Sequence, residues 1–377
     1  MKLTKIIIHL SVTILMIITL HPISAYSQGE SAVPFLLIAP NSRASGMGES
    51  GTGIADDASA IFWNPAGLAF QKGQEISITH SNWLPQFMMS DLFYEYLGYK
   101  GHFEEIGGTI GANIIYLSLG EFIKTLSSGP EEVGRFKAYE FAITGGYATQ
   151  LFDNFGLGVN LRFIRSALAP FGTEEEKGSG VANTMSFDIA TLYRLPLSNG
   201  EFLSDMNIGL NLANLGPKVT YIDEKQADPL PTNLRLGLGF NLLKGEFNNI
   251  QANIDFQRIL VRRYKPPLDS LGKRLSDPPP PDPVHKAIFS AWGDGSGLRK
   301  VTIGAGLEYW YGSPKLIALR FGYFYEDPSF GNRKFLTFGA GIRYDIYGFD
   351  FSYLSAMEEN HPLAETLRFT LLINFVD

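Results

Sequence analysis

Apolar and polar residues alternate along most of the chain from residue 75 to its C-terminal end. In one stretch Leu234, Leu236, Leu238 and Phe240 are apolar, while the positions between them hold glycine or polar residues. A period of two residues gives a β-strand one apolar and one polar face. The pattern predicts strands at residues 74–82, 92–101, 107–117, 138–149, 155–166, 184–195, 205–213, 232–243, 250–260, 301–311, 315–326, 335–344, 347–356 and 366–376.

Glycine and arginine recur on the polar face of these segments, as at Arg235, Gly237 and Arg368. A soluble β-sandwich also alternates, but it turns its apolar faces inward to form a core. In a membrane the apolar face meets lipid and the polar face lines a lumen. The sequence therefore predicts an all-β fold, a transmembrane antiparallel β-barrel of about 14 strands.

The connections between the predicted strands alternate in length. Short turns fall at residues 102–106, 150–154, 244–249, 312–314 and 345–346, with a longer one at 196–204. Long loops fall at residues 118–137, 167–183, 214–231, 261–300 and 357–365. Outer-membrane barrels place short turns in the periplasm and longer loops outside. We expect that arrangement here, with both chain ends on the periplasmic side.

The N-terminal residues have the features of a secretory signal peptide. Lys2 and Lys5 precede an apolar run at residues 6–20, and Ala25 and Ser27 are small residues at the spacing of a cleavage site. We expect removal after roughly Ser27. An anchoring helix is the alternative, but the run is shorter than the about 20 residues that span a bilayer. Together with the strand pattern, this predicts the outer membrane of a Gram-negative bacterium, with the signal peptide removed.

A stretch without alternation lies between the signal peptide and the first strand. A barrel of about 14 strands has a lumen wider than its own side chains can fill. We therefore expect this stretch to fold into the lumen and plug it as a hatch. The predicted parts of the chain are a signal peptide at 1–27, a hatch segment with a short helix at 28–73, and the barrel at 74–377.

A short helix is predicted near the end of this hatch segment. Asp56 or Asp57 can cap a helix that runs to about Trp63. The helix should stop at Asn64, because the residue before Pro65 is disfavoured in the α region. We expect these five residues to have structural roles in the hatch.

Charged residues lie in phase with the predicted lumen face of the strands. They are Arg162, Arg235, Arg320, Arg343, Arg368, Asp255 and Glu308. The planar guanidinium of arginine can hold carboxylates and backbone carbonyls together. We expect an internal ion-pair network that fixes the hatch; the alternative is that these side chains contact a solute in the lumen.

The sequence shows no motif for catalysis, metal binding or a cofactor. It has no cysteine, and its six histidines lack the spacing of metal ligands. The glycines of residues 46–53 follow no predicted strand and lack the lysine of a phosphate-binding loop. Asp56 and Asp57 could be paired acids, but helix capping explains them better. We expect no enzymatic activity, no metal and no cofactor, and the net charge of −7 gives no basic surface for nucleic acid.

Several segments resemble a known group of outer-membrane proteins. The segment ADDASAIFWNPAGLA is similar to the N-terminal signature of FadL-like transport barrels, whose fold is a 14-stranded barrel with an internal hatch. The PorV branch of that group is similar at VPFLLIAPNSRASGMGESGTG, SNWLPQF, LSLGEF, LRFIRSALA, PTNLRLGLGF, AIFSAWGDGSGLRK and GLEYWY. The resemblance covers nearly the whole mature chain. The proline run at residues 277–283 and the chain end after Phe375 fit the family pattern less well.

The resemblance implies a part in the type IX secretion system. Members of this branch accept cargo that has crossed the outer membrane through the translocon barrel, and they recognise the C-terminal β-domain of the cargo. They deliver it to a cell-surface attachment complex with a sortase-like protein. The implied partners are the translocon barrel, the sortase-like attachment protein, cargo C-terminal β-domains and outer-membrane lipid. Two alternatives are a FadL-like channel for hydrophobic small molecules and a purely structural role, as in the related PorQ branch.

Protein partners must meet such a barrel at its outer loops. The first loop is unusually apolar for an exposed connection, and aromatic residues and methionines are common interface anchors. The loop at 261–300 joins a stiff proline run to a second apolar cluster. The alternatives are a lipid-dipping anchor or a lid over the hatch for the first loop, and a mobile surface for the long one. We expect partner contacts through Trp83, Leu84, Phe87, Met88, Met89, Tyr221, Phe289 and Trp292.

Overall fold

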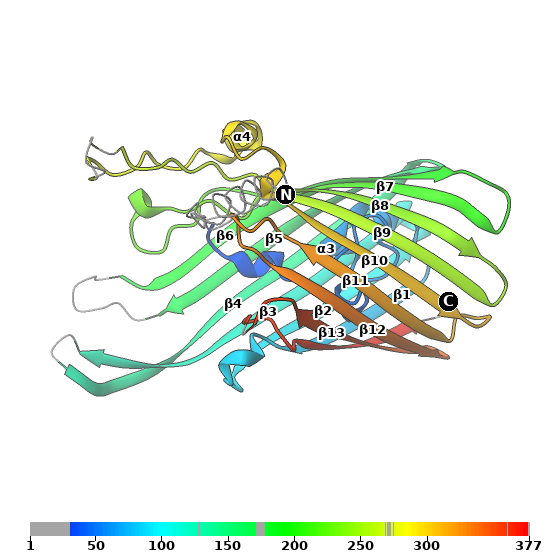
Figure 1. The fold of residues 1–377 in the computed structure, drawn as a ribbon, viewed down its shortest axis with the longest axis horizontal. Helices are drawn as coiled ribbons and strands as arrows, with labels where there is room; N and C mark the ends of the chain where they lie inside the picture. The colour runs from blue at the N-terminus through cyan, green and yellow to red at the C-terminus, as the bar shows by residue number, and fades with distance from the viewer. Residues whose placement is uncertain are drawn as a thin grey trace, which may run out of the picture.

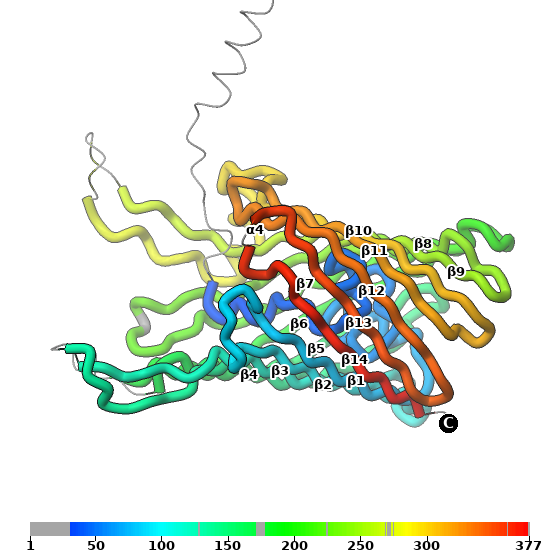
Figure 2. The backbone as a smooth tube through the Cα atoms, turned by 60° about the horizontal axis from the view of Figure 1, so that its bottom comes forward, coloured from blue at the N-terminus to red at the C-terminus, as the bar shows by residue number. Residues whose placement is uncertain are grey.

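The computed structural model describes residues 31–126, 129–170, 178–267, 269, 273, 275–359 and 361–375. These residues form a closed barrel of 14 antiparallel strands, with the N-terminal segment inside the ring of strands (Figure 1 and Figure 2). The predicted fold class and strand number are confirmed. The predicted signal peptide lies outside the described residues.

The strands follow one another around the barrel in sequence order, and the ring closes between the first and the last. Their bounds are β1 Gln74–Asn82, β2 Leu92–Phe103, β3 Gly108–Leu126, β4 Gly129–Phe152, β5 Phe155–Ala169, β6 Gly180–Pro196, β7 Phe202–Leu215, β8 Asn233–Lys244, β9 Asn248–Ile259, β10 Val301–Tyr311, β11 Ile317–Tyr325, β12 Lys334–Tyr344, β13 Tyr347–Ala356 and β14 Leu367–Phe375.

Short helices fill the N-terminal segment and the loops. In the N-terminal segment they are η1 Pro34–Leu37, α2 Ser42–Ser45, α3 Ala60–Trp63 and η2 Pro65–Phe70. In the connections they are η3 Pro85–Phe87, η4 Glu104–Ile106, η5 Glu224–Gln226, α4 Val284–Ser290, η6 Ala291–Gly293 and η7 Gly297–Lys300. No helix in the described parts of the chain has the length and hydropathy needed to cross a bilayer.

The two-residue alternation of the sequence gives the barrel wall its two faces. On β11, Leu319 is 57% exposed, whereas the adjacent Arg320 is 4% exposed. Ile317 and Phe321 are exposed in the same phase as Leu319. The outer face of this strand is therefore apolar, while its inner face carries a buried charge, as expected of a strand between lipid and a lumen.

Strands β3 and β4 are longer than the sequence predicts. Instead of a loop at 118–137, strand pairing continues past Phe122, which lies opposite Phe136. These two rings stack with their centroids 5.7 Å apart, a cross-strand contact that stabilises a ribbon. A register shift next to Gly120 interrupts the alternation and hides the strands in the sequence. The hairpin extends outward from the long-loop end of the barrel in Figure 1.

The N-terminal segment runs from the end of the barrel with the long loops to the end with the short turns. The Ala32 amide donates a hydrogen bond to the Pro229 carbonyl between β7 and β8 (2.9 Å). At the other end, Lys100 Nζ near the end of β2 donates to the Lys72 carbonyl (2.7 Å). The sequence predicts both chain ends on the short-turn side, but the first described residue, Ser31, lines a cavity at the long-loop end.

Glycines let this segment touch the barrel wall backbone to backbone. Gly48 has a φ of +71°, and an added Cβ there would lie 2.5 Å from the Tyr323 carbonyl oxygen and 2.6 Å from that of Ala305. A Cβ on Gly322 of β11 would overlap the backbone of Met47 and Gly48. Both the left-handed conformation and the close approach therefore require glycine at residue 48.

Helix α3 ends at Trp63, as the sequence predicts. Asn64 is extended, with φ −160° and ψ 96°. Its side chain accepts a hydrogen bond from the Ala66 amide (3.1 Å), which begins the 3-10 helix η2 at Pro65. Its Nδ2 group also donates to the carbonyls of Thr52 and of Thr191 on β6, so Asn64 ties this turn to the wall.

Candidate functional site

Arg43 joins the N-terminal segment to the barrel wall through a buried carboxylate. Its Nε and Nη2 donate to the two oxygens of Glu308 on β10, at 2.8 and 2.7 Å. Its Nη1 binds Asp56 and Asp57. Glu308 also accepts a hydrogen bond from Arg320 Nε on β11 (2.7 Å). Charge-assisted, bidentate bonds of this kind fix geometry strongly, so Arg43 ties α2 to β10, and Glu308 links it further to Arg320 of β11.

The same network continues along the wall to β13. Arg320 Nη1 and Arg343 Nη2 bind the two oxygens of Asp350, at 2.8 and 2.7 Å. The structure thus brings together Arg320, Arg343 and Glu308, which sequence reasoning selected, with Arg43 and Asp350, which it missed. Asp350 lies in the lumen phase of β13 and could have been found from the alternation. Arg43 lies in a segment without periodicity, where no pattern identifies it.

Asp56 and Asp57 lie before the first residue of α3 and face a charged side chain. The N-cap of α3 is Ser59, and no side chain caps the helix there. Asp57 accepts hydrogen bonds from the amide and hydroxyl of Ser59, and both aspartates face Arg43. Asp57 therefore binds a local backbone amide and the long-range cation together, whereas Asp56 binds the cation.

Arg162 lies in a second buried network. Its Nη2 binds Asp188 on β6 at 2.8 Å, and the same carboxylate accepts the Asn214 amide (2.7 Å). Asn160 Nδ2 donates to Asp188 (2.9 Å) and to the Ile61 carbonyl of α3 (2.8 Å). This network therefore also connects the wall to the N-terminal segment.

The other charged lumen residues contact the N-terminal segment without bidentate ion pairs. Arg235 stacks on Phe62 and Trp63, with its Cζ 4.8 and 5.1 Å from the ring centroids. Arg368 lies 3.9 Å from a glutamate of the segment. Asp255 accepts two backbone amides of the segment, at 3.0 and 2.9 Å. Each of these three wall residues faces the segment.

A cavity of about 720 Å³ opens at the long-loop end. Its apolar lining comes from the N-terminal segment, the wall and the loops, and includes Phe35, Trp83, Leu117 and Phe324. Four carboxylates also line it, those of Glu49, Glu140, Asp228 and Glu326. This volume, and apolar walls with a few polar groups, are typical of small-molecule sites.

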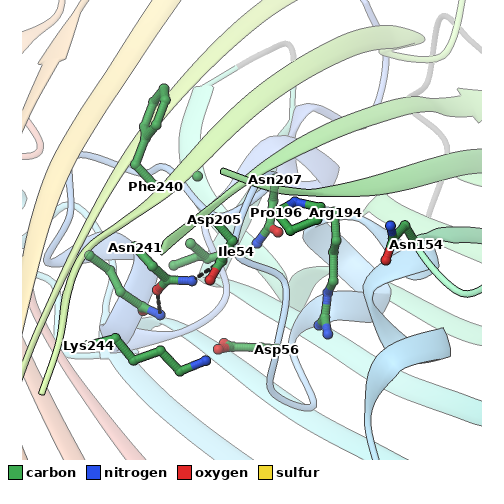
Figure 3. A pocket seen from close by; sticks show the side chains of 12 residues that line it. Ile54, Asp56, Asn154, Arg194, Pro196, Asp205, Asn207, Phe240, Asn241 and Lys244 are labelled. Atoms are coloured by element: carbon green, nitrogen blue, oxygen red, sulfur yellow. Dashed lines mark hydrogen bonds between the residues drawn. The ribbon is translucent and has the colours of Figure 1, made fainter. Parts of the chain in front are cut away.

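A smaller cavity of about 280 Å³ opens at the short-turn end (Figure 3). In Figure 3 the Lys244 side chain points toward Asp56, and Asn241 is hydrogen-bonded to Asp205. Arg194 lies over the Phe70 ring of η2, with Cζ 4.0 Å from the centroid. The lining is largely polar, so this opening forms a polar vestibule on the short-turn side of the N-terminal segment.

The described residues contain no group of three or more His, Cys, Asp or Glu side chains placed to hold a metal ion.

Comparison with protein families shows the relationship of the chain. Residues 27–266 match the family described as Type IX secretion system protein PorV. The chain belongs to the PorV family. The match spans more than half of the chain and includes the described N-terminal segment and strands β1 to β9. A comparison with curated proteins finds no match.

Solved structures similar to this PorV-family chain include two toluene transporters. TbuX of Ralstonia pickettii aligns at 12% identity and a TM-score of 0.51, over 91% of this chain and 100% of the transporter. TodX of P. putida aligns at 11% identity and a TM-score of 0.51, over 94% of this chain and 100% of the transporter. A Pseudomonas aeruginosa FadL homologue aligns at 11% identity and a TM-score of 0.48, over 89% and 98%. At this identity the likeness to the two toluene transporters shows the barrel fold alone.

Five of the partner residues predicted for this PorV-family chain are exposed. Met88 is 92% exposed, and Phe87 and Met89 beside it are also exposed, next to η3 in the first loop. Phe289 of α4 is 77% exposed, and Trp292 of η6 is exposed on one side while Arg258 lies over its ring at 4.6 Å. Large apolar side chains are therefore accessible at two loops of the long-loop end.

The other three predicted partner residues lie inside the loop layer. Trp83 and Leu84 pack against a buried cluster that contains Phe335. Tyr221 is half-buried, and its hydroxyl donates to Ser166 Oγ (2.8 Å). Trp83 and Tyr221 also line the larger cavity. Their side chains form the wall of that cavity instead of an exposed surface.

The loop at 261–300 is organised around Asp282. Its carboxylate accepts hydrogen bonds from Lys286 Nζ (2.7 Å), Ser290 Oγ (2.7 Å) and the Tyr264 hydroxyl (3.1 Å). Burial by itself raises the pKa of Asp282, but these hydrogen bonds outweigh it and hold the pKa below the ordinary value. The carboxylate therefore fixes α4, which carries Phe289.

Proposed function

We propose that this chain is an outer-membrane carrier of the type IX secretion system. It binds the C-terminal β-domains of secreted proteins after translocation and delivers them to the cell-surface attachment complex with its sortase-like protein. The observation that carries this proposal is the PorV family match over residues 27–266. The closed barrel with an apolar outer face is consistent with the outer membrane. In this role the chain binds and transfers proteins without catalysing a reaction.

In this proposal residues 28–73 are a hatch that plugs the lumen. Support comes from the described part of the segment, which is tied to opposite parts of the wall. Gly48 touches the backbone of β10 and β11, while the Ile61 carbonyl is bonded to Asn160 of β5. Since a plugged barrel offers no path for a folded domain, cargo is bound at the long-loop end.

The exposed apolar residues of two loops are the proposed docking surface. Phe87, Met88 and Met89 form one part, and Phe289 and Trp292 form the other. Unbranched methionines adapt to different partners, and aromatic residues supply large contact areas. This suits a carrier that must meet the translocon barrel, the cargo and the attachment protein in turn.

Binding of a purified cargo C-terminal β-domain to the purified barrel tests this proposal. We expect the variant with Phe87→Ser, Met88→Ser and Met89→Ser to bind at least about tenfold more weakly, because interface anchors of this kind contribute more than about 1 kcal/mol each. Phe247→Ser is the matched control, since Phe247 is an exposed aromatic in a short turn. Unchanged cargo affinity in the triple variant would contradict the docking surface, and no affinity in the wild type would contradict the carrier role.

A second candidate function is a FadL-like channel for hydrophobic small molecules. The cavity of about 720 Å³ with its apolar walls favours it. Uptake of a hydrocarbon into liposomes that contain the barrel would support this channel. Equal uptake into liposomes with and without the barrel would exclude it.

A further inference from the structure

One side of the cavity at the long-loop end is a continuous apolar surface. Phe35 of η1 and Leu117 and Leu119 of β3 belong to it, and Trp83 and Tyr221 extend it toward the loops. Phe35 and Leu117 are buried in the packed core, so this surface is part of the fixed wall. An apolar ligand body placed here would keep most of its area out of water.

A buried carboxylate faces the same side of the cavity. Glu140 lies on the lumen face of β4, directly opposite Leu117 in the β3–β4 pairing, and it is 5% exposed. Its Oε1 accepts a hydrogen bond from Ser166 Oγ (2.9 Å), and Ser166 in turn accepts one from Tyr221. In the described part of the chain Glu140 forms no ion pair, although a buried carboxylate without a cation is strongly disfavoured.

The other carboxylates of the cavity have cationic partners. Glu326 accepts two hydrogen bonds from Arg333, at 2.7 and 2.9 Å. Asp228 pairs with Arg263 at 2.5 Å, and Glu49 lies 3.9 Å from an arginine of β14. Glu140 therefore differs from its neighbours in lacking a protein cation. A ligand can supply that charge.

We propose that this cavity binds an amphiphile with a protonated amine head group. The ammonium group pairs with Glu140, and the apolar chain packs on Phe35, Leu117 and Trp83. An anionic head group at the same place would instead lie beside Glu140, the carboxylate of the cavity without a cation in the described part of the chain. The inference concerns a resident small molecule and does not depend on cargo binding.

The head-group preference of the wild-type protein tests this proposal first. The full mature barrel is placed in amphipol, and binding of dodecylamine, dodecanol and dodecanoic acid is followed by the fluorescence of Trp83, with Trp83→Phe as the reference. At about pH 7.5 the amine is protonated, because alkyl amines titrate near the lysine value of about 10.4. We expect the amine to bind at least about tenfold more tightly than the acid or the alcohol. Equal affinities for the three compounds would overturn the proposal.

A variant of the carboxylate tests the role of Glu140 directly. Glu140→Gln keeps the shape and removes the charge, so we expect it to lose at least about tenfold in affinity for dodecylamine and little for dodecanol. Glu132→Gln is the matched control, since Glu132 is an exposed glutamate of the same strand. Unchanged affinity for the amine in Glu140→Gln would refute the site. If this variant does not assemble, the wild-type preference for the amine decides the question alone.

Discussion

Arg43 places a full charge inside the barrel, where only its carboxylate partners make the charge tolerable. An unpaired buried ion costs several kcal/mol, so the guanidinium and its partners are stable only as a set. The set joins α2 to Glu308 of β10 and to both aspartates before α3. At the residue scale, the position of the N-terminal segment therefore depends strongly on one arginine.

We predict that Arg43→Ala loosens this segment. Breaking a buried ion pair by removing one partner costs about 3–5 kcal/mol, because the remaining charge keeps no counter-ion. The expected results are a lower thermal transition and a higher conductance in planar bilayers. Arg135→Ala is the control, since Arg135 pairs on the exposed β3–β4 hairpin. An Arg43→Ala barrel with the conductance and thermal transition of the wild type would contradict the role of the network.

The sequence identifies which residues face the lumen better than it identifies their partners. Arg320 and Glu308 follow from a two-residue period, which is a local property of a strand. The partner of Asp57 cannot be predicted in this way, because Arg43 belongs to a segment whose sequence has no period. Trp83 shows the same limit: its apolar character is evident, but the direction of its side chain depends on how the loops pack.

At the scale of elements, the N-terminal segment and the wall fit together through glycine. A Cβ at residue 322 would overlap the backbone of residues 47 and 48, and neither backbone can move without breaking the strand or the turn. Steric conflicts of this kind typically cost about 1–3 kcal/mol. The contact is therefore as important for the placement of the segment as the ion pairs are.

We predict that Gly322→Ala lowers the thermal transition of the barrel and raises its conductance, because the added methyl group pushes residues 47 and 48 away from β11. Gly145→Ala is the control: an added Cβ there meets nothing within 4 Å. Equal behaviour of the two variants in both measurements would show that the backbone contact at β11 does not hold the segment.

The structure around α4 should depend on pH through Asp282 and Asp294. Burial raises the pKa of Asp294, but hydrogen bonds from Lys300 and Ser296 lower it to about 2 overall. Asp282 is also shifted down. A carboxylate whose pKa is lowered in the folded state stabilises the fold fully at pH values above its ordinary pKa of about 3.9. This stabilisation is lost as the pH falls through the pKa of the folded state.

We therefore expect the loop to lose structure between about pH 4 and pH 2. The emission of Trp292, taken as the difference between the wild type and Trp292→Phe, reports this change. Asp282→Asn should weaken the loop already at neutral pH, because it removes the negative charge and one of the two oxygens that hold Lys286 and Ser290. A transition centred above pH 5 would show that these two aspartates do not control it.

Strand prediction succeeds where the alternation is regular and fails where it is interrupted. β1, β10 and β13 have the bounds that the sequence predicts. In β3 and β4 a register shift beside Gly120 moves the apolar residues out of phase, so a period of two is lost although the strands continue. The sequence does not predict helix α4, whose position depends on the hydrogen bonds of Asp282 within the loop.

At the scale of the whole molecule, the two ends of the barrel differ. The short-turn end has a polar vestibule, whereas the long-loop end has exposed apolar loops, a projecting hairpin and the larger cavity. The proposed carrier role needs a binding surface at one end only. The asymmetry of the barrel fits that requirement.

Affinity capture of the tagged protein from outer membranes tests the carrier role most directly. We predict that mass spectrometry finds secreted proteins with intact C-terminal β-domains, together with the translocon barrel and the sortase-like protein, and that the Phe87, Met88 and Met89 triple variant loses the cargo while its barrel still assembles. Recovery of the translocon or the sortase-like protein with no cargo from the wild type would contradict the carrier role and indicate a purely structural part in secretion.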